Sequence, residues 1–170
     1  MSEVTTPSEE VRGWDALARA AANRGDSSES LDEIRQLLSF ELAGAPYAVP
    51  VERVREIVRM RPVTPVPRMP EEVRGVISLR GEMIELIDLR RRLSLGSIEP
   101  DRRTRIIVIK ADDDEVVGLL VDAVREVLRV SDEAIQPATG SDTGAVSELC
   151  KFRDEFVSMI ELDRVLSLDV

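Results

Sequence analysis

The sequence predicts a mainly β protein made of two similar small lobes, and three observations support this prediction. From residue 34 onward, short runs of Val, Ile and Leu are separated by turn residues, which is typical of strands. Only five of the 170 residues are aromatic, so the interior must be built from aliphatic side chains. Two segments also recur later in the chain in the same order, which indicates a duplicated unit.

Residues 1–33 differ in composition from the rest of the chain. They hold eight acidic residues and three arginines, a net charge of −5, which is half of the total of −10. This composition predicts a flexible, disordered acidic tail.

 The alternative is a short amphipathic helix that forms on a partner, because Trp14, Leu17, Ala18 and Ala21 recur at helical spacing.

The first half after this tail predicts strands joined by turns. Leu38, Phe40 and Leu42 alternate with polar residues before Gly44, which predicts a strand and then a turn. Several prolines follow and predict an extended linker. Residues 70–75 begin with Pro and Glu and end with Gly, so they predict one helical turn.

Residues 105–121 predict a hairpin with an acidic tip. A continuous β-branched run at 105–110 is followed by four acidic residues, Asp112 to Glu115, and by a second apolar run at 116–121. The acidic tip lacks the alternation and the glycine of a calcium-binding loop, so we interpret it as a solvated turn.

The internal repeat is the most informative feature. Residues 54–60 and 124–130 are identical at four of seven positions, and residues 81–95 and 154–168 are identical at seven of fifteen. Each unit is expected to contain a hairpin, a crossing strand and a final strand that leads into a short helix. We place the two β lobes at approximately 34–104 and 105–168. The alternative is chance similarity between aliphatic strands.

Composition excludes several classes of function. Without histidine the chain has no imidazole base, no Ser–His or Cys–His nucleophile pair and no histidine metal ligand. The acidic balance argues against a nucleic-acid partner. No apolar run approaches the roughly 20 residues that a membrane span requires, so we expect no direct membrane insertion. The lone Cys150 fits a reducing cytosol, and we interpret it as a small buried residue rather than a nucleophile. We therefore expect no catalytic residue, no metal and no cofactor.

The remaining candidate for a functional feature is the surface around Arg80 and Gly81. Gly81 permits a positive φ that turns the chain sharply after Arg80. An arginine held at such a bend can pair bidentately with a carboxylate, and Glu56 is the candidate. The alternative is that Arg80 is an independent solvated side chain. Two small β lobes with such surfaces are suited to presenting edges and grooves to other proteins.

The segment from Val73 to Arg90 resembles the hallmark of the CheW family, a G-V-hydrophobic-N-L-R-G run followed by an apolar strand that closes in D-L-R. Residues 116–124 are similar to the second signature of that family, V-G-hydrophobic-hydrophobic-V-D-x-V, and residues 54–57 match its V-x-E-I element. Residues 37–60 resemble the opening hairpin of the family, and the resemblance covers about residues 34–168. Ser78 stands where the family usually has Asn, and Glu148 stands near a usual glycine.

This resemblance implies two intertwined five-stranded SH3-like β-barrel lobes with short helices. It also implies a non-catalytic cytoplasmic scaffold of a receptor array, which joins the cytoplasmic tip of a chemoreceptor to the regulatory domain of the histidine kinase CheA. The receptor- or kinase-binding residues that it implies are Val54, Glu56, Val58, Gly75, Ser78, Leu79, Arg80, Gly81, Gly118 and Val121. Two alternatives remain open: an adaptor of a motility or other non-flagellar chemosensory pathway, and a ligand-sensing regulator that uses the groove between the lobes.

Overall fold

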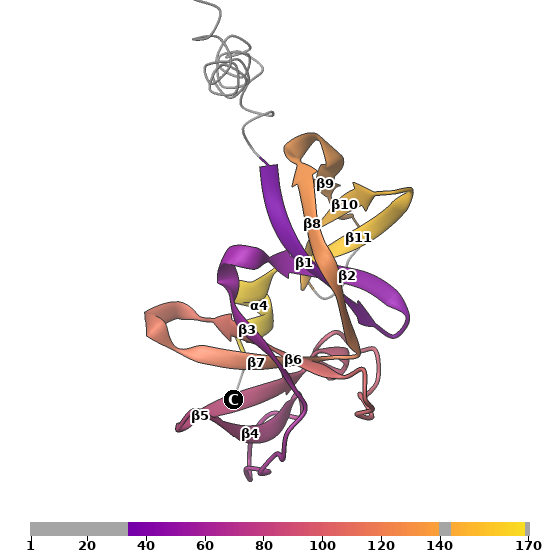
Figure 1. Ribbon diagram of the computed structural model, residues 1–170. Coiled ribbons are helices and arrows are strands. Elements are labelled where there is room, and N and C mark those ends of the chain that lie inside the picture. The colour runs from indigo at the N-terminus through magenta and orange to yellow at the C-terminus, as the bar shows by residue number, and fades with distance from the viewer. Residues whose placement is uncertain (1–33, 140–143, 169–170) are drawn as a thin grey trace, which may run out of the picture.

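The computed structural model describes residues 34–139 and 144–168, which form two β-sheets with a few short helical elements (Figure 1). The expected acidic tail, residues 1–33, lies outside the described residues. Across the described part of the chain, we find no helix with the length and apolar character that a membrane crossing requires.

The first half of the described chain contains five strands. They are β1 (Ile34–Leu42), β2 (Ala45–Pro50), β3 (Val54–Arg59), β4 (Val73–Leu79) and β5 (Glu82–Asp88). A 3-10 turn, η1 (Val51–Arg53), precedes β3, and a short helix, α3 (Leu89–Arg92), follows β5.

The second half repeats this order and adds one short strand. Its strands are β6 (Arg105–Lys110), β7 (Val116–Val121), β8 (Ala123–Ser131), β9 (Ile135–Pro137), β10 (Val146–Phe152) and β11 (Glu155–Ile160). Its helical elements are η2 (Asp112–Asp114), η3 (Asp132–Ala134) and α4 (Leu162–Leu166). The sequence repeat therefore pairs β3 with β8 and β5 with β11, and each final strand leads into a short helix, as predicted.

The two halves are intertwined, as the resemblance implies. Sheet A has the strand order β8-β1-β2-β11-β10-β9, and sheet B has the order β3-β6-β7-β5-β4. The first hairpin of each half thus lies in the sheet that holds the last strands of the other half. The parallel pairs β2–β11 and β5–β7 join the halves within each sheet. As a result, the ranges 34–104 and 105–168 each contribute strands to both sheets, which lie one above the other in Figure 1.

Sheet B has the expected five strands, but sheet A has six, so the five-stranded expectation needs a correction there. The extra strand, β9, pairs with β10 over only three residues. At the equivalent place in the first half, Thr64 makes an isolated bridge to Val76 of β4. The same crossing therefore exists twice, and it is long enough to count as a strand only in the second half.

Both predicted hairpins are confirmed. Strands β1 and β2 pair antiparallel across a two-residue turn, Ala43 and Gly44, whose φ values are +52° and +82°. Strands β6 and β7 pair antiparallel, and the acidic residues at their tip form the 3-10 turn η2. Glu148, the departure from the family pattern, lies at a bulge in β10, where its Oε1 atom is 3.2 Å from Nη1 of Arg35.

The predicted helical turn at residues 70–75 is wrong. Val73 begins strand β4, and alternate residues of this strand point into the core. The Val73 amide donates a hydrogen bond of 2.9 Å to the Pro70 carbonyl, which closes a tight turn before the strand. The Pro and Glu residues therefore mark a turn, because the period-two burial of β4 overrides the local helix signals.

Gly75 lies at a bulge in β4 where the linker after β3 crosses the strand. Its φ is +142°, and a Cβ atom at this position would overlap the Thr64 carbonyl group. Thr64 and Val76 exchange two backbone hydrogen bonds of 2.9 Å at this crossing. Glycine is therefore required by both the backbone conformation and the close approach.

The core is aliphatic, as predicted, and it draws on both sheets. Strand β1 is buried on both faces, because Leu38 joins the main cluster while Leu37 joins a smaller cluster of sheet A that includes Cys150. Ser39 lies at the bulge between β1 and β8, where its hydroxyl donates to the Glu126 carbonyl at 2.7 Å and accepts from the Glu126 amide at 3.1 Å. The buried serine is thus fully satisfied.

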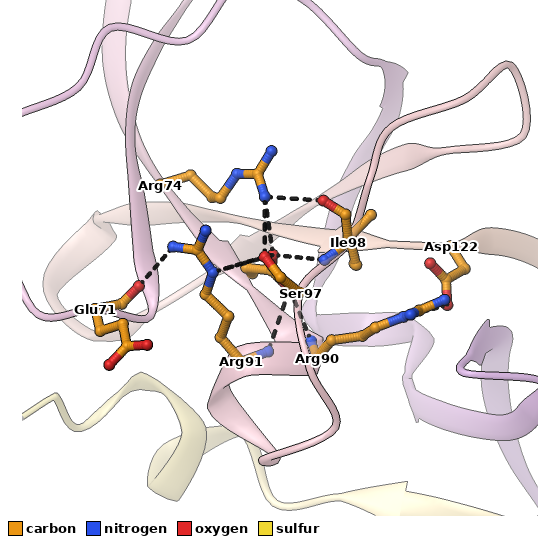
Figure 2. A network of polar contacts seen from close by, with 8 residues as sticks. Glu71, Arg74, Arg90, Arg91, Ser97, Ile98 and Asp122 are labelled. Atoms are coloured by element: carbon orange, nitrogen blue, oxygen red, sulfur yellow. Dashed lines mark hydrogen bonds and ion pairs between the residues drawn. The ribbon is translucent and has the colours of Figure 1, made fainter.

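A buried carboxylate fixes the segment after β5. Asp88 is completely buried at the start of α3, and its Oδ1 accepts hydrogen bonds from the amides of Arg90 at 3.0 Å and Arg91 at 3.3 Å. Its Oδ2 accepts from the Ile98 amide at 3.0 Å and from Nη1 of Arg74 at 3.2 Å (Figure 2). One side chain therefore holds helix α3, the following loop and strand β4 together.

Arginines on α3 then join this segment to the other half of the chain. Nη2 of Arg90 lies 2.7 Å from Oδ2 of Asp122, which also accepts a hydrogen bond of 2.7 Å from the Ala43 amide. Arg92 donates to the carbonyl of Val165 at 2.9 Å, at the end of α4. These contacts fix the position of the two sheets relative to each other.

Candidate functional site

The ion pair expected from the sequence is present at the end of sheet B. Nη2 of Arg80 lies 3.0 Å from Oε1 of Glu56. The Glu56 side chain is 17% exposed and the Arg80 side chain is 68% exposed. A largely buried carboxylate on β3 therefore holds a guanidinium that is open to solvent on its other side. Because the pair is mostly exposed on the arginine side, its contribution to folding is small.

The local sequence explains why Arg80 reaches this position. Strands β4 and β5 are joined by only two residues, Arg80 and Gly81, whose φ values are +54° and +84°. Two positive φ values at a two-residue connection define a type I′ hairpin turn, which suits the right-handed twist of the strands. The turn carries Arg80 out of the ladder and beside β3.

A second ion pair joins the same two elements. Nη1 of Arg55 lies 3.2 Å from Oε1 of Glu82. Nearby, Arg61 donates from Nη1 to the Ser78 carbonyl at 3.2 Å. Within the described part of the chain, Oε2 of Glu56 and Nε of Arg61 are buried and have no hydrogen-bond partner. Glu56 therefore retains one unused acceptor, and Arg61 nearby retains one unused donor. We call the set Arg55, Glu56, Arg80 and Glu82 the β3 site.

The residues that the resemblance implies are divided between this surface and the interior. Glu56 shares one side of β3 with Val54 and Val58, which are half-buried. Ser78 is exposed at the end of β4, whereas Leu79 is only 4% exposed. The exposed members next to the turn are thus available to a partner, and the others support the turn from within.

Gly75, Gly118 and Val121 lie in the interior. Val121 is completely buried in the main core. A Cβ atom on Gly118 would lie 2.9 Å from Cγ2 of Ile106, so this glycine permits close packing of β7 against β6. Gly75 permits the linker crossing described above. These three positions shape the sheet that carries the site, and their side chains do not reach the surface.

Sequence reasoning missed several exposed residues next to these positions. Arg55, Ile57 and Arg59 occupy the exposed side of β3, and Ile57 is 41% exposed. Met83, directly after the turn, is 65% exposed. The alternation of β3 was the signal that could have identified the first three, because residues two apart in a strand share a face.

The second half carries the same arrangement at the repeat-equivalent positions, which we call the β8 site. Nη1 of Arg153 lies 3.8 Å from Oε2 of Glu126, and Nη1 of Arg125 lies 3.6 Å from Oε1 of Glu155. These residues correspond through the repeat to Arg80, Glu56, Arg55 and Glu82. Their ion pairs are longer than those of the β3 site. The molecule therefore presents one charged pattern twice, once at the edge of each sheet.

Exposed apolar residues follow the same duplication. Val127 is 52% exposed and Phe156 is 51% exposed. They correspond through the repeat to Ile57 and Met83. An exposed apolar side chain beside an arginine is a common feature of protein-binding surfaces.

The remaining electrostatics lie away from the β3 and β8 sites. A hydrogen bond from the Arg103 amide holds the pKa of Asp101 below its usual range. Burial raises the pKa of the Tyr47 hydroxyl and of the Cys150 thiol. Cys150 is completely buried, which agrees with its interpretation as a packing residue. Among residues 34–139 and 144–168, no group of three or more acidic or cysteine side chains is arranged to hold a metal ion.

Comparisons with known proteins agree with this architecture. The model of the family described as CheW-like domain matches residues 36–170. Chemotaxis protein CheW of Rhizobium meliloti is 36% identical over 135 residues, which cover 77% of this chain and 86% of that protein. Chemotaxis protein CheW of Helicobacter pylori is 30% identical over 151 residues, which cover 87% of this chain and 91% of that protein.

A solved structure gives the same result. The crystal structure of the scaffolding protein TtCheW from Thermoanaerobacter tengcongensis is 31% identical in sequence, with a TM-score of 0.73. The match covers 79% of this chain and 94% of that chain.

Two intertwined β-sheets that present the same charged turn twice form a protein-binding scaffold module. The chain belongs to the CheW family, because the family model spans nearly all of its described residues. It is a coupling scaffold of chemotaxis, a role in which no catalytic step is indicated.

Proposed function

We propose that this chain couples the cytoplasmic tip of a chemoreceptor to the regulatory domain of the histidine kinase CheA, as a cytoplasmic component of a bacterial receptor array. The duplicated charged turn is the observation that carries this proposal. A scaffold must hold two partners at once, and the repeat places the same pattern of arginine, glutamate and apolar side chain at the edges of two different sheets. Binding free energy is then the only output that the protein needs to supply.

The β3 site is proposed as one of the two contact surfaces. Arg80 uses one guanidinium nitrogen for Glu56, and the exposed remainder can bind a carboxylate of the partner. Ile57 and Met83 supply exposed apolar surface from the same two elements. Reversible protein contacts of this kind bury about 1,200–2,000 Å² in total.

A hollow lined by Glu41, Arg90, Arg103 and Asp122 is the candidate for the ligand groove between the lobes, and it is poorly suited to a small ligand. Its arginines already pair with its own acids, since Nη2 of Arg103 lies 2.8 Å from Oε1 of Glu41 and Arg90 binds Asp122. A ligand would have to displace these ion pairs. The geometry therefore favours the scaffold over the ligand-sensing regulator.

Reversing the charge of Arg80 tests the β3 site. Arg80→Glu is expected to raise the dissociation constant for the kinase regulatory domain or the receptor fragment about tenfold or more, because two carboxylates then face each other at the site. Glu56→Arg combined with Arg80→Glu is expected to restore part of the affinity. Calorimetric titration of each variant measures the effect.

Arg102→Glu is the matched control for this experiment. Arg102 is also an exposed arginine, and its side chain makes no hydrogen bond or ion pair with the described residues. This variant is expected to bind both partners as the unmodified chain does. If Arg80→Glu also binds both partners normally, the β3 site is wrongly assigned.

A further inference from the structure

One face of the β1–β8 ladder is exposed at the point where the described chain begins. Partners that lie opposite each other in an antiparallel ladder point to the same face. Gln36 lies opposite Arg129, Leu38 lies opposite Val127, and Ile34 lies opposite Ser131. Since alternate residues of a strand share a face, these six residues lie on one face. Leu38 is buried in the main core, and the exposed members are Ile34, Gln36, Val127 and Arg129, which we call the β1–β8 face.

This face is apolar and basic, and it is open. Ile34 is 48% exposed and Val127 is 52% exposed, the largest exposures of aliphatic side chains in either strand. Arg129 is exposed, and its side chain makes no hydrogen bond or ion pair with any residue of the described ranges. By contrast, Arg125 on the same strand is paired with Glu155. The β1–β8 face therefore offers a free guanidinium beside two exposed aliphatic side chains, which suits an acidic and apolar occupant.

The chain itself carries a segment with that chemistry, and the segment ends at this face. Residues 1–33 have a net charge of −5, and they end directly before Ile34. Within them, Trp14, Leu17, Ala18 and Ala21 have the spacing of an apolar helical stripe. The large side chains of this stripe match the exposed aliphatic residues of the face, and the acidic residues around it match Arg129.

The length of chain between stripe and face is sufficient. Residues 22–33 connect Ala21 to β1, and a coil of this length spans about 20 Å. Val127 lies four residues before Ser131 along β8, a distance of about 14 Å. The apolar stripe can therefore reach the face, and the short tether gives it an effective concentration on the order of millimolar.

We propose that the stripe Trp14–Ala21 docks in cis on the β1–β8 face, with its acidic neighbours beside Arg129. The N-terminal segment then covers strand β8 next to the β8 site, and a partner that binds there has to displace it. Docking in cis does not depend on the proposed function. The expected competition with a partner does rest on that function.

Trp14 is the sole tryptophan of the chain, so its fluorescence reports on this segment alone. In the full chain, Trp14 is expected to be protected from acrylamide, with a quenching constant about half or less of the value for a synthetic peptide of residues 1–33, if the docked state is populated at least half of the time. Val127→Glu and Arg129→Glu are each expected to return the constant toward the peptide value. Both positions are exposed, so these variants retain the fold.

The repeat supplies matched controls. Ile57→Glu and Arg59→Glu change the equivalent exposed positions of β3, beside which no N-terminal segment ends, and they are expected to leave Trp14 protected. Three results would overturn the proposal: a Trp14 as exposed in the full chain as in the peptide, equal release by the β3 and β8 variants, or protection that rises with protein concentration, which would indicate a second copy as the occupant. None of these measurements requires the kinase or the receptor, so a negative result leaves the proposed function untouched.

Discussion

Gly75→Ala is expected to destabilise the fold by about 3–5 kcal/mol, from backbone strain together with the loss of hydrogen bonds at the linker crossing. A side chain at φ +142° is strained, and its Cβ atom would overlap the backbone of Thr64. The overlap forces the linker away from β4, which breaks the two hydrogen bonds between Thr64 and Val76. Urea unfolding followed by circular dichroism measures the change.

Gly44→Ala is the control for this substitution. Gly44 also has a positive φ, +82°, but a Cβ atom there would have no neighbour within 4 Å. Its cost is therefore conformational only, about 1–2 kcal/mol. Equal costs at the two positions would contradict the packing of the linker against Gly75.

Asp88→Ala is expected to have a similarly large effect, about 3–5 kcal/mol, because it removes one partner of a buried charged pair. Arg74 would then lie beside an empty space, with only 20% of its side chain exposed. The amides of Arg90, Arg91 and Ile98 would also lose their acceptor. The free energy of unfolding from urea titration is the measurement. Asp88→Asn, which keeps the shape and loses the charge, is expected to cost less than the alanine variant.

Asp163→Ala provides the comparison for Asp88. Asp163 likewise lies near the start of a short helix, but its side chain is 70% exposed and lies 3.6 Å from Nη2 of Arg53. Such an exposed pair contributes less than about 1 kcal/mol. A loss at Asp88 no greater than the loss at Asp163 would show that the buried network does not stabilise α3.

Local patterns predicted the elements whose structure depends on their own residues. The hairpin at 105–121 follows from two β-branched runs around an acidic turn, and the short helices follow from the ends of the repeated segment. The prediction of a helical turn at residues 70–75 was wrong because this segment's conformation depends on a residue outside it. Its conformation depends on Thr64, which the linker brings against Gly75, and no local signal reports that contact.

The exchange of hairpins between the halves also lies beyond local patterns. The repeat indicates that two equivalent units exist, but it does not state which strands pair. The parallel pairs β2–β11 and β5–β7 join residues that are far apart in the sequence, and packing of the whole chain selects them. Intertwining was therefore expected only from the family resemblance.

The candidate site was predicted in part. Arg80 was expected at a sharp bend, with Glu56 as the candidate carboxylate beside it, and the structure contains that ion pair. The pair between Arg55 and Glu82 was missed, although both residues belong to the repeated segments. Taking the repeat as a guide to surface as well as to strands would have identified it, together with its counterpart at Arg125 and Glu155.

The central claim is that one chain holds a kinase and a receptor at the same time. Size-exclusion chromatography with light scattering, on a mixture of the full chain, the CheA regulatory domain and a receptor cytoplasmic fragment, tests it directly. The account predicts one peak that contains all three proteins, and loss of at least one partner from that peak with Arg80→Glu. Elution of the chain apart from both partners would contradict it.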